Sequence, residues 1–234
     1  MRYAVYFAPD ESSAWWRFGA RWLGRDAATG EAREQPAIEG IDRESFRALT
    51  AEPRRYGFHA TLKAPFALRS RAARVELAAA VERFCAARLP FQMPPLEVAR
   101  VDDFLAFVPA AHETRINELA ADCVRELDAF RAPATPAELA RRRGKALSTR
   151  QDRYLEEWGY PYVLADFRFH LTLTGSLDGV SPHHSAAVLA AARENATALA
   201  GEPLWFDAVC LFEQADAAGP FRLAARFPLG RGAR

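Results

Sequence analysis

Residues 54–66 read RRYGFHATLKAPF, and residues 167–177 read FRFHLTLTGSL. Both stretches contain Phe-His-x-Thr-Leu, a pattern that places a histidine two residues before a threonine inside an apolar run. The two histidines, His59 and His170, are 111 positions apart (170 − 59) in a chain of 234 residues that has only 5 histidines. A repeat of the whole pattern at about half the chain length indicates a shared site built from two similar halves.

Strand geometry predicts that each copy has one polar and one apolar face, because successive side chains of a strand point to opposite sides. The apolar residues of each copy then pack against helices, and the polar residues line a site. The residues assigned to the polar face are His59, Thr61, Lys63 and, upstream, Arg55 in the first copy, and His170, Thr172, Thr174 and Arg168 in the second copy.

Two imidazoles beside hydroxyls and cations suit the attack of water on a phosphate ester without a metal. One imidazole accepts a proton from water and the other donates a proton to the leaving oxygen, and the ordinary histidine pKa of about 6.5 permits both roles near neutral pH. Threonine hydroxyls can bind the non-bridging phosphate oxygens, and lysine or arginine can offset the negative charge of the transition state.

The pattern of apolar residues predicts the same order of elements in both halves: a motif strand, a helix and a pair of strands. This is typical of a duplicated α+β unit. We expect strands at 1–9, 95–110 (a hairpin), 204–212 and 221–229, a short helix beginning after an N-cap at Asp10, a short helix after Asp42, and longer helices at 70–89, 112–130 and from Pro182, with Ser181 as N-cap.

Residues 132–162 form an additional piece between the two halves. Two capping-box patterns, Thr135 to Glu138 and Ser148 to Gln151, predict two short helices, the second of which stops at Gly159. The piece carries five basic residues without an intervening acid, namely Arg141, Arg142, Arg143, Lys145 and Arg150. As a helical flap over an anionic substrate it would supply Arg141 and Arg143 as phosphate contacts, whereas in the alternative these arginines form a solvated helix face.

The overall composition excludes several classes of protein. The net charge of +1 lacks the excess expected of a protein that holds long nucleic acid by its phosphates, so nucleic acid is possible but not favoured as a partner. There is no signal-peptide pattern and no apolar run long enough to cross a bilayer, so we expect a cytoplasmic protein with no membrane partner.

Cys85, Cys123 and Cys210 are widely spaced in apolar sequence, which favours reduced core thiols. No third ligand is spaced to complete a zinc site with the motif histidines, so neither a metal nor a cofactor is expected.

On the two motifs, the sequence resembles the two-histidine (2H) phosphoesterase superfamily, which includes RNA 2′,3′-cyclic phosphodiesterases and LigT-like proteins. The resemblance covers most of the chain except 132–162. It implies one bilobal α+β domain whose two pseudo-symmetric lobes are antiparallel sheets packed with helices, with both motif strands lining a central cleft. The lobes would comprise about 1–131 and 163–234, and exchange of strands between them is possible.

The resemblance also implies metal-independent action on cyclic phosphodiesters, with His59 and His170 as the acid/base pair and Thr61 and Thr172 as phosphate-binding residues. The segments RYGFHATLKAPF, WGYPYV and FRFHLTLTG are similar to a branch of the superfamily associated with phosphonate utilisation. That setting favours a small phosphorylated sugar or nucleotide as the substrate, for example a ribose 1,2-cyclic phosphate.

Two alternative functions remain open at this point. One is an RNA 2′,3′-cyclic phosphodiesterase or 2′-5′ RNA ligase, which would bind oligonucleotides with strong salt dependence. The other is a non-catalytic module that binds a phosphorylated ligand, although the presence of both histidines and both threonines favours an enzyme. The sequence leaves open which histidine is the base, which ester oxygen leaves and the oligomeric state.

Overall fold

The strands of this protein form antiparallel sheets, as the computed structural model shows for residues 1–70, 73–143 and 146–230. The described strands form a four-stranded sheet of order β2-β1-β8-β9, a three-stranded sheet of order β4-β5-β6 and a two-stranded sheet of β3 and β7. Their bounds are β1 Arg2–Phe7, β2 Ala60–Phe66, β3 Phe91–Gln92, β4 Leu96–Val101, β5 Phe104–Pro109, β6 Leu171–Thr172, β7 Trp205–Phe206, β8 Ala208–Gln214 and β9 Arg222–Pro228. With the helices below, this confirms the predicted α+β class.

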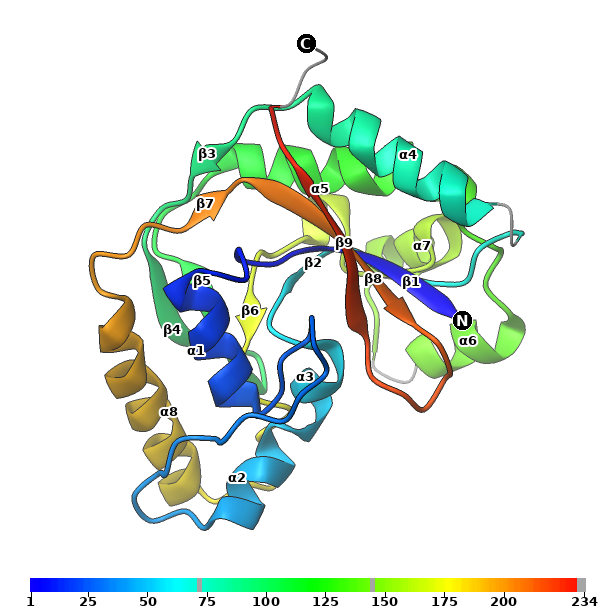
Figure 1. Cartoon of the computed structure of the whole chain (residues 1–234). Helices are drawn as coiled ribbons and strands as arrows, with labels where there is room; N and C mark the ends of the chain where they lie inside the picture. Colours follow the sequence, from blue (N-terminus) through cyan, green and yellow to red (C-terminus); the bar gives the residue numbers. More distant parts are fainter. Residues whose placement is uncertain (71–72, 144–145, 231–234) are drawn as a thin grey trace.

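Helices cover these sheets (Figure 1): α4 packs on β8 and β9, α5 packs on β2, and α8 packs on β4. The α-helices are α1 Ala14–Leu23, α2 Arg43–Leu49, α3 Ala51–Tyr56, α4 Ala73–Ala86, α5 Thr114–Glu126, α6 Pro136–Arg142, α7 Thr149–Trp158 and α8 Pro182–Ala196, and the 3-10 helices are η1 Asp128–Phe130, η2 Leu164–Asp166 and η3 Thr197–Leu199. Residues 71–72 of the helix expected at 70–89 lie outside the described residues. No helix of the described part is long and apolar enough to span a membrane.

Side-chain caps fix most of the helix starts that the sequence predicts. Both capping boxes form, at Thr135 with Glu138 and at Ser148 with Gln151, and Ser181 caps α8 as expected. The predicted cap at Asp10 is wrong, because Ser13 accepts from the backbone N–H of Trp16 and caps α1 instead. Asp10 lies one turn earlier, where its side chain accepts from Ser12 and its carbonyl accepts from the backbone N–H of Ser13.

The first motif strand begins at Ala60, later than the alternating pattern predicts. The residues before it form α3, which ends at Gly57 with a φ of 84°. A Cβ at Gly57 would lie 2.6 Å from the Cβ of Ala27, so this turn requires glycine. The prediction that Arg55 shares the polar face of the motif strand is therefore wrong, since Arg55 lies on a helix.

Each of the two larger sheets contains strands from both halves of the chain. The first motif strand, β2, belongs to a sheet completed by β8 and β9, whereas the second, β6, pairs with β5 of the first half. The sheets share a core in which the rings of Phe7 and Phe169 lie 5.7 Å apart. Strands from the two halves of the chain are thus combined within each of these sheets, and the two motifs enter this core from different sheets.

Candidate functional site

The His59 ring lies just before β2 and is held from two sides. Its Nδ1 is 2.9 Å from the carbonyl oxygen of Gly57, and its Nε2 is 3.2 Å from the hydroxyl of Thr61. The ring stacks on Tyr6 of β1 with 3.7 Å between the ring centres. Because a carbonyl can only accept, Nδ1 carries the proton and Nε2 of the neutral ring accepts from Thr61.

Burial lowers the pKa of His59 to about 4, although the bond to the Gly57 carbonyl opposes this shift. A smaller contribution comes from the positive charge of His170, which disfavours protonation of His59. The two imidazoles therefore interact electrostatically, and the proton of one disfavours the proton of the other. At neutral pH His59 is therefore a neutral ring with a basic nitrogen.

His170 has the same local arrangement as His59. Its Nδ1 is 2.7 Å from the carbonyl oxygen of Arg168, two residues earlier, so Nε2 is again the nitrogen free of the backbone. The ring of Phe104 on β5 lies 5.4 Å from it. Burial lowers the pKa of His170, the bond to the Arg168 carbonyl raises it, the charge of Arg168 lowers it, and that of Asp102 raises it.

The backbone therefore orients both imidazoles in the same way. In each motif the carbonyl of the residue two positions before the histidine fixes the Nδ1 proton, at Gly57 and at Arg168. One nitrogen of each ring is left as an acceptor in the neutral form or a donor in the charged form. The pair can accept one proton and donate another, which is the requirement for general acid–base catalysis.

Thr61 and Thr172 are half-buried, as expected of hydroxyls that border a site. Thr61 lies opposite Tyr6 in the sheet, and Thr172 lies opposite Ala106 of β5. Thr174 differs, because it is fully buried and its hydroxyl accepts from the backbone N–H of Leu105 at 3.0 Å. The prediction that Thr174 shares an open polar face is wrong, since this side chain completes the hydrogen bonding of β5.

The predicted position of Lys63 is also wrong, and a β-bulge is the reason. Tyr6 lies opposite Thr61 but Val5 lies opposite Lys63, so β2 has one extra residue at this step. Residues opposite each other in a sheet share a face, so Lys63 faces the side of Val5 and not that of Thr61. The Lys63 ammonium is buried, 2.7 Å from a carboxylate oxygen of Asp128.

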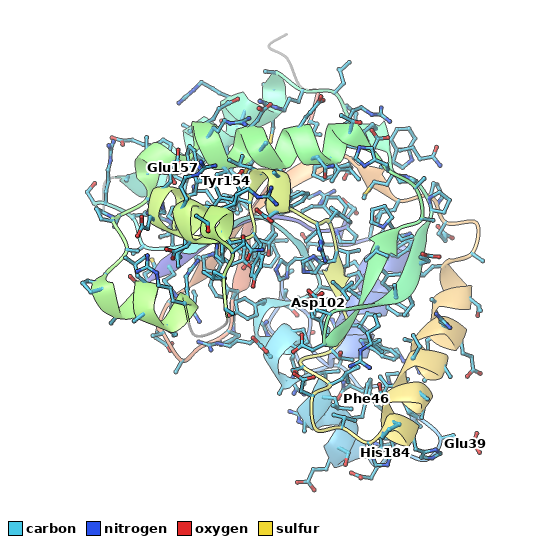
Figure 2. All side chains as sticks on the ribbon, turned by 180° about the vertical axis from the view of Figure 1, so that it is seen from behind. Glu39, Phe46, Asp102, Tyr154, Glu157 and His184 are labelled. Atoms are coloured by element: carbon cyan, nitrogen blue, oxygen red, sulfur yellow. The ribbon has the colours of Figure 1, made fainter. Side chains whose placement is uncertain are left out.

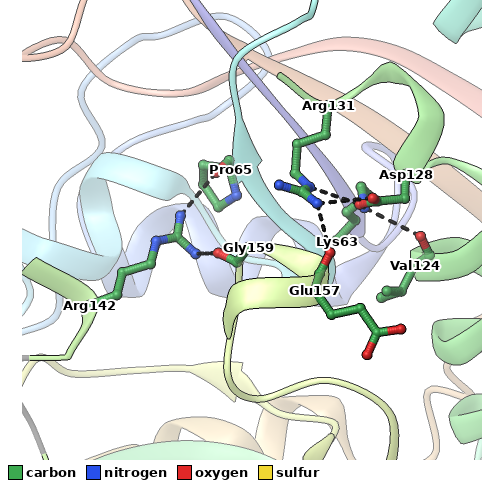
Figure 3. A network of polar contacts seen from close by, with 8 residues as sticks. All are labelled: Lys63, Pro65, Val124, Asp128, Arg131, Arg142, Glu157 and Gly159. Carbon is green, nitrogen blue, oxygen red and sulfur yellow. Dashed lines mark hydrogen bonds and ion pairs between the residues drawn. The ribbon is translucent and has the colours of Figure 1, made fainter. Parts of the chain in front are cut away.

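Asp128 joins Lys63 to a network behind β2 (Figure 3). Arg131 donates to both carboxylate oxygens, at 2.8 and 2.9 Å, and Lys63 also donates to the carbonyl of Val124. Burial favours the neutral form of Asp128, yet the bonds from Arg131 and Lys63 outweigh it and hold the pKa of Asp128 below its usual range. Lys63 is thus an internal counter-ion.

The predicted arginines are dispersed. Arg55 donates to the carbonyls of Gly219 and Ala217, in the loop between β8 and β9. Arg168 is exposed, and its guanidinium lies 3.8 Å from Asp102 at the tip of the β4–β5 hairpin (Figure 2). In the flap, Arg141 is exposed and Arg143 pairs with Asp152 and Glu156, each at 2.6 Å.

The flap is attached to β2 through a different arginine. Arg142 donates to the carbonyl of Gly159 and, at 3.1 Å, to the carbonyl of Pro65. Lys145, the other basic residue of the run, lies outside the described residues. Sequence reasoning passed over Arg142 in favour of its neighbours, and it passed over Tyr6, although strand alternation does place Tyr6 on the face opposite to Val5 and Phe7.

Comparison with known proteins shows the family. Residues 61–222 match a family described as "Protein of unknown function (DUF1045)". The chain belongs to this family. It is also similar to two proteins named ribose 1,5-bisphosphate phosphokinase PhnN. The relative from Janthinobacterium sp. (strain Marseille) is 41% identical over 239 residues, which cover 100% of this chain and 52% of the relative. The relative from Laribacter hongkongensis (strain HLHK9) is 35% identical over 224 residues, which cover 95% of this chain and 50% of the relative.

This chain thus spans about half the length of the curated relatives that it matches. Both relatives carry a name that refers to a phosphorylated ribose and to phosphoryl transfer.

Proposed function

We propose that this DUF1045 chain is a metal-independent phosphodiesterase that opens a cyclic phosphate on a small phosphorylated sugar or nucleotide. The observation that carries the proposal is the matched orientation of the two imidazoles, each with Nδ1 bound to a backbone carbonyl and Nε2 free of the backbone. The resemblance of the two motifs to the two-histidine phosphoesterases supports the same reaction.

The different surroundings of the two rings suggest separate roles. His59, whose pKa burial lowers to about 4, is the general base, because it is unprotonated at neutral pH. His170 takes the remaining role of general acid; burial and the charge of Arg168 oppose its charged form, whereas the bond to the Arg168 carbonyl and the carboxylate of Asp102 favour it. His59 takes a proton from water, the water oxygen bonds to phosphorus, one P–O bond of the ring breaks, and His170 protonates the oxygen that leaves. In this step the Thr61 hydroxyl turns its proton from His59 Nε2 to a non-bridging oxygen, which frees Nε2 for the water, and the Thr172 hydroxyl binds a second non-bridging oxygen.

The names of the relatives favour a ribose derivative as the substrate. Opening the 1,2-cyclic phosphate of ribose 5-phosphate at the bond to O2 yields ribose 1,5-bisphosphate, the compound in those names. A kinase activity of this chain, which matches about half the length of those relatives, is less well supported. A P-loop needs Gly-x-x-x-x-Gly-Lys followed by Ser or Thr, and the single Gly-Lys pair of this sequence, Gly144-Lys145, is followed by Ala146.

Phosphorus NMR tests the proposal. Purified protein with a chelator is incubated with ribose 1,2-cyclic phosphates, nucleoside 2′,3′-cyclic phosphates and an RNA that ends in a cyclic phosphate. We expect opening of a small cyclic phosphate by the wild type and a loss of at least about 1,000-fold in His59→Ala and His170→Ala. Turnover of the RNA alone would replace the small-substrate proposal with the RNA phosphodiesterase. Ligand binding without turnover, equal in wild type and His170→Ala, would establish the non-catalytic module.

A further inference from the structure

Arg142, the last residue of α6, is a half-buried guanidinium whose position is fixed by main-chain carbonyls. It donates to Gly159, just after α7, and to Pro65 of β2, so it joins both flap helices to the motif strand. Figure 3 shows Arg142 on one side of β2 and the Lys63–Asp128 pair on the other. Its side chain is therefore rigidly placed on the side of β2 away from the internal counter-ions.

Arg142 forms no direct ion pair with a carboxylate within residues 1–70, 73–143 and 146–230, although the charge of Glu138 acts on it from a greater distance. Glu138, one helical turn earlier, is committed to the capping box, where it accepts from the backbone and hydroxyl of Thr135. Arg143, the next residue, pairs with two carboxylates. Buried charges in proteins are normally paired, so a fixed guanidinium without an acid is suited to an anion that arrives with a ligand.

Arg142 retains donors for such an anion. A guanidinium has five N–H groups, and the two carbonyl bonds occupy two of them. The centre of the guanidinium lies 5.4 Å from the ring centre of Tyr160. Burial raises the pKa of Tyr160 to about 12, and the charge of Arg142 opposes this shift, so the phenol is protonated at neutral pH and can donate as well.

Two further tyrosines, Tyr6 and Tyr56, lie beside His59 and interact electrostatically with Arg142 and Tyr160, respectively. Tyr6 stacks on His59 at 3.7 Å, and Tyr56 lies 6.1 Å from the same imidazole. The charge of Arg142 also acts on the hydroxyl of Tyr6, and that of Tyr56 acts on Tyr160. His59 immediately precedes β2 and Arg142 is bonded to the carbonyl of Pro65 in the same strand, so both side chains border β2.

We propose that Arg142, with Tyr160, binds a second phosphate of the substrate, separate from the cyclic phosphate that faces His59 and His170. The substrate class is then a cyclic phosphate of a pentose that carries a further phosphate monoester. This inference rests on the proposed function for the position of the reacting phosphate, but the binding of the second phosphate is measurable without turnover.

The experiment compares ribose 1,2-cyclic phosphate with its 5-phosphorylated form in wild type, Arg142→Gln, Arg142→Lys and Arg153→Gln. Arg153 is an exposed arginine of α7 and serves as the matched control. We expect Arg142→Gln to lower kcat/KM about 100-fold for the 5-phosphorylated substrate, mainly by raising KM. For ribose 1,2-cyclic phosphate without the 5-phosphate, the loss should be less than about 3-fold. Arg142→Lys should recover part of the loss, and Arg153→Gln should match the wild type.

Calorimetric titration with ribose 5-phosphate separates this inference from the proposed function. Binding by the wild type that is lost in Arg142→Gln supports the second-phosphate site even if no cyclic phosphate is turned over. Equal losses for both substrates, with a lower melting temperature, would assign Arg142 a purely structural role in holding the flap. If the wild type neither binds ribose 5-phosphate nor prefers the phosphorylated substrate, the inference is overturned.

Discussion

The two copies of Phe-His-x-Thr-Leu have the same sequence pattern but different surroundings. His59 follows a helix, stacks on Tyr6 and accepts from Thr61. His170 precedes a strand of only two residues and lies beside Phe104, next to the exposed Arg168. What the copies share is one backbone contact, from Nδ1 to the carbonyl two residues earlier.

The residues two positions beyond each threonine diverge further. Lys63 is turned by a bulge toward Asp128, and Thr174 completes the hydrogen bonding of β5. The comparison teaches that the repeat specifies the histidine and the threonine, while the neighbouring polar residues serve the sheet in which each copy lies.

The largest expected difference between the copies is in their proton-transfer roles. A substrate whose leaving group is p-nitrophenol needs little help from a general acid. We expect His170→Ala to lose about 1,000-fold on a cyclic sugar phosphate but less than about 10-fold on a p-nitrophenyl diester. His59→Ala should lose about 1,000-fold on both, because the attacking water still needs a base. The reverse pattern, measured by initial rates, would exchange the two roles.

The pH dependence of the wild type sharpens the same comparison. The base must be unprotonated, which holds above the His59 pKa of about 4, and the acid must be protonated, which holds below the pKa of His170. Burial lowers the latter from its ordinary value of about 6.5. We therefore expect kcat/KM to peak on the acid side of pH 6.5 and to fall about tenfold per pH unit above the His170 pKa. A plateau that extends to pH 8 in phosphorus NMR assays would contradict the assignment.

Lys63→Met tests whether Lys63, two residues beyond Thr61 in the first copy of the motif, contributes to activity or only to stability. Removal of the ammonium leaves Asp128 with Arg131 alone, so we expect the free energy of unfolding in urea to fall by about 2 kcal/mol. Under conditions where the protein is folded, kcat/KM should stay within about 3-fold of the wild type. Arg125→Met, which removes an exposed cation from α5, should leave stability unchanged. A loss of activity without a loss of stability would restore Lys63 to the site.

Thr172→Val and Thr174→Val form a matched pair within the second copy. Thr172→Val should lower kcat/KM about 10-fold with little change in stability, because its hydroxyl is assigned to phosphate. Thr174→Val leaves the buried N–H of Leu105 without an acceptor, so it should lower the free energy of unfolding by about 1–2 kcal/mol and leave kcat/KM of the folded protein nearly unchanged. Urea titration and initial rates on both variants decide between the two assignments.

The smallest expected effect is on acid stability. The folded-state pKa of His59, about 4, lies below the unfolded value of about 6.5, so at pH 5 the unfolded chain binds a proton that the folded chain does not. The contribution of His59 is complete above pH 6.5 and is lost as the pH falls toward 4. Between pH 7 and 5 the wild type should lose about 1 kcal/mol more stability than His59→Asn, since the ring is only partly removed from solvent. Equal losses in urea titrations would show that the pKa of His59 is not lowered.

The sequence by itself determined the α+β class and most helix starts, and it singled out the two histidines as the candidate site. These features depend on local patterns, namely alternation in strands, apolar spacing in helices and side chains that cap the next turn, as at Thr135, Ser148 and Ser181. The pattern around His59 and His170 was visible because it recurs.

Only the tertiary structure decided which other polar residues approach the histidines. The face of Lys63 depends on a bulge set by the pairing of β2 with β1, and the position of Arg55 depends on a helix that ends where Gly57 passes close to Ala27. Arg142 is distinguished from Arg141 and Arg143 by contacts with β2 that are distant in sequence. Local spacing cannot distinguish side chains of the same type that lie close together in the sequence. Long-range contacts, which depend on the whole fold, show which of these side chains reaches β2.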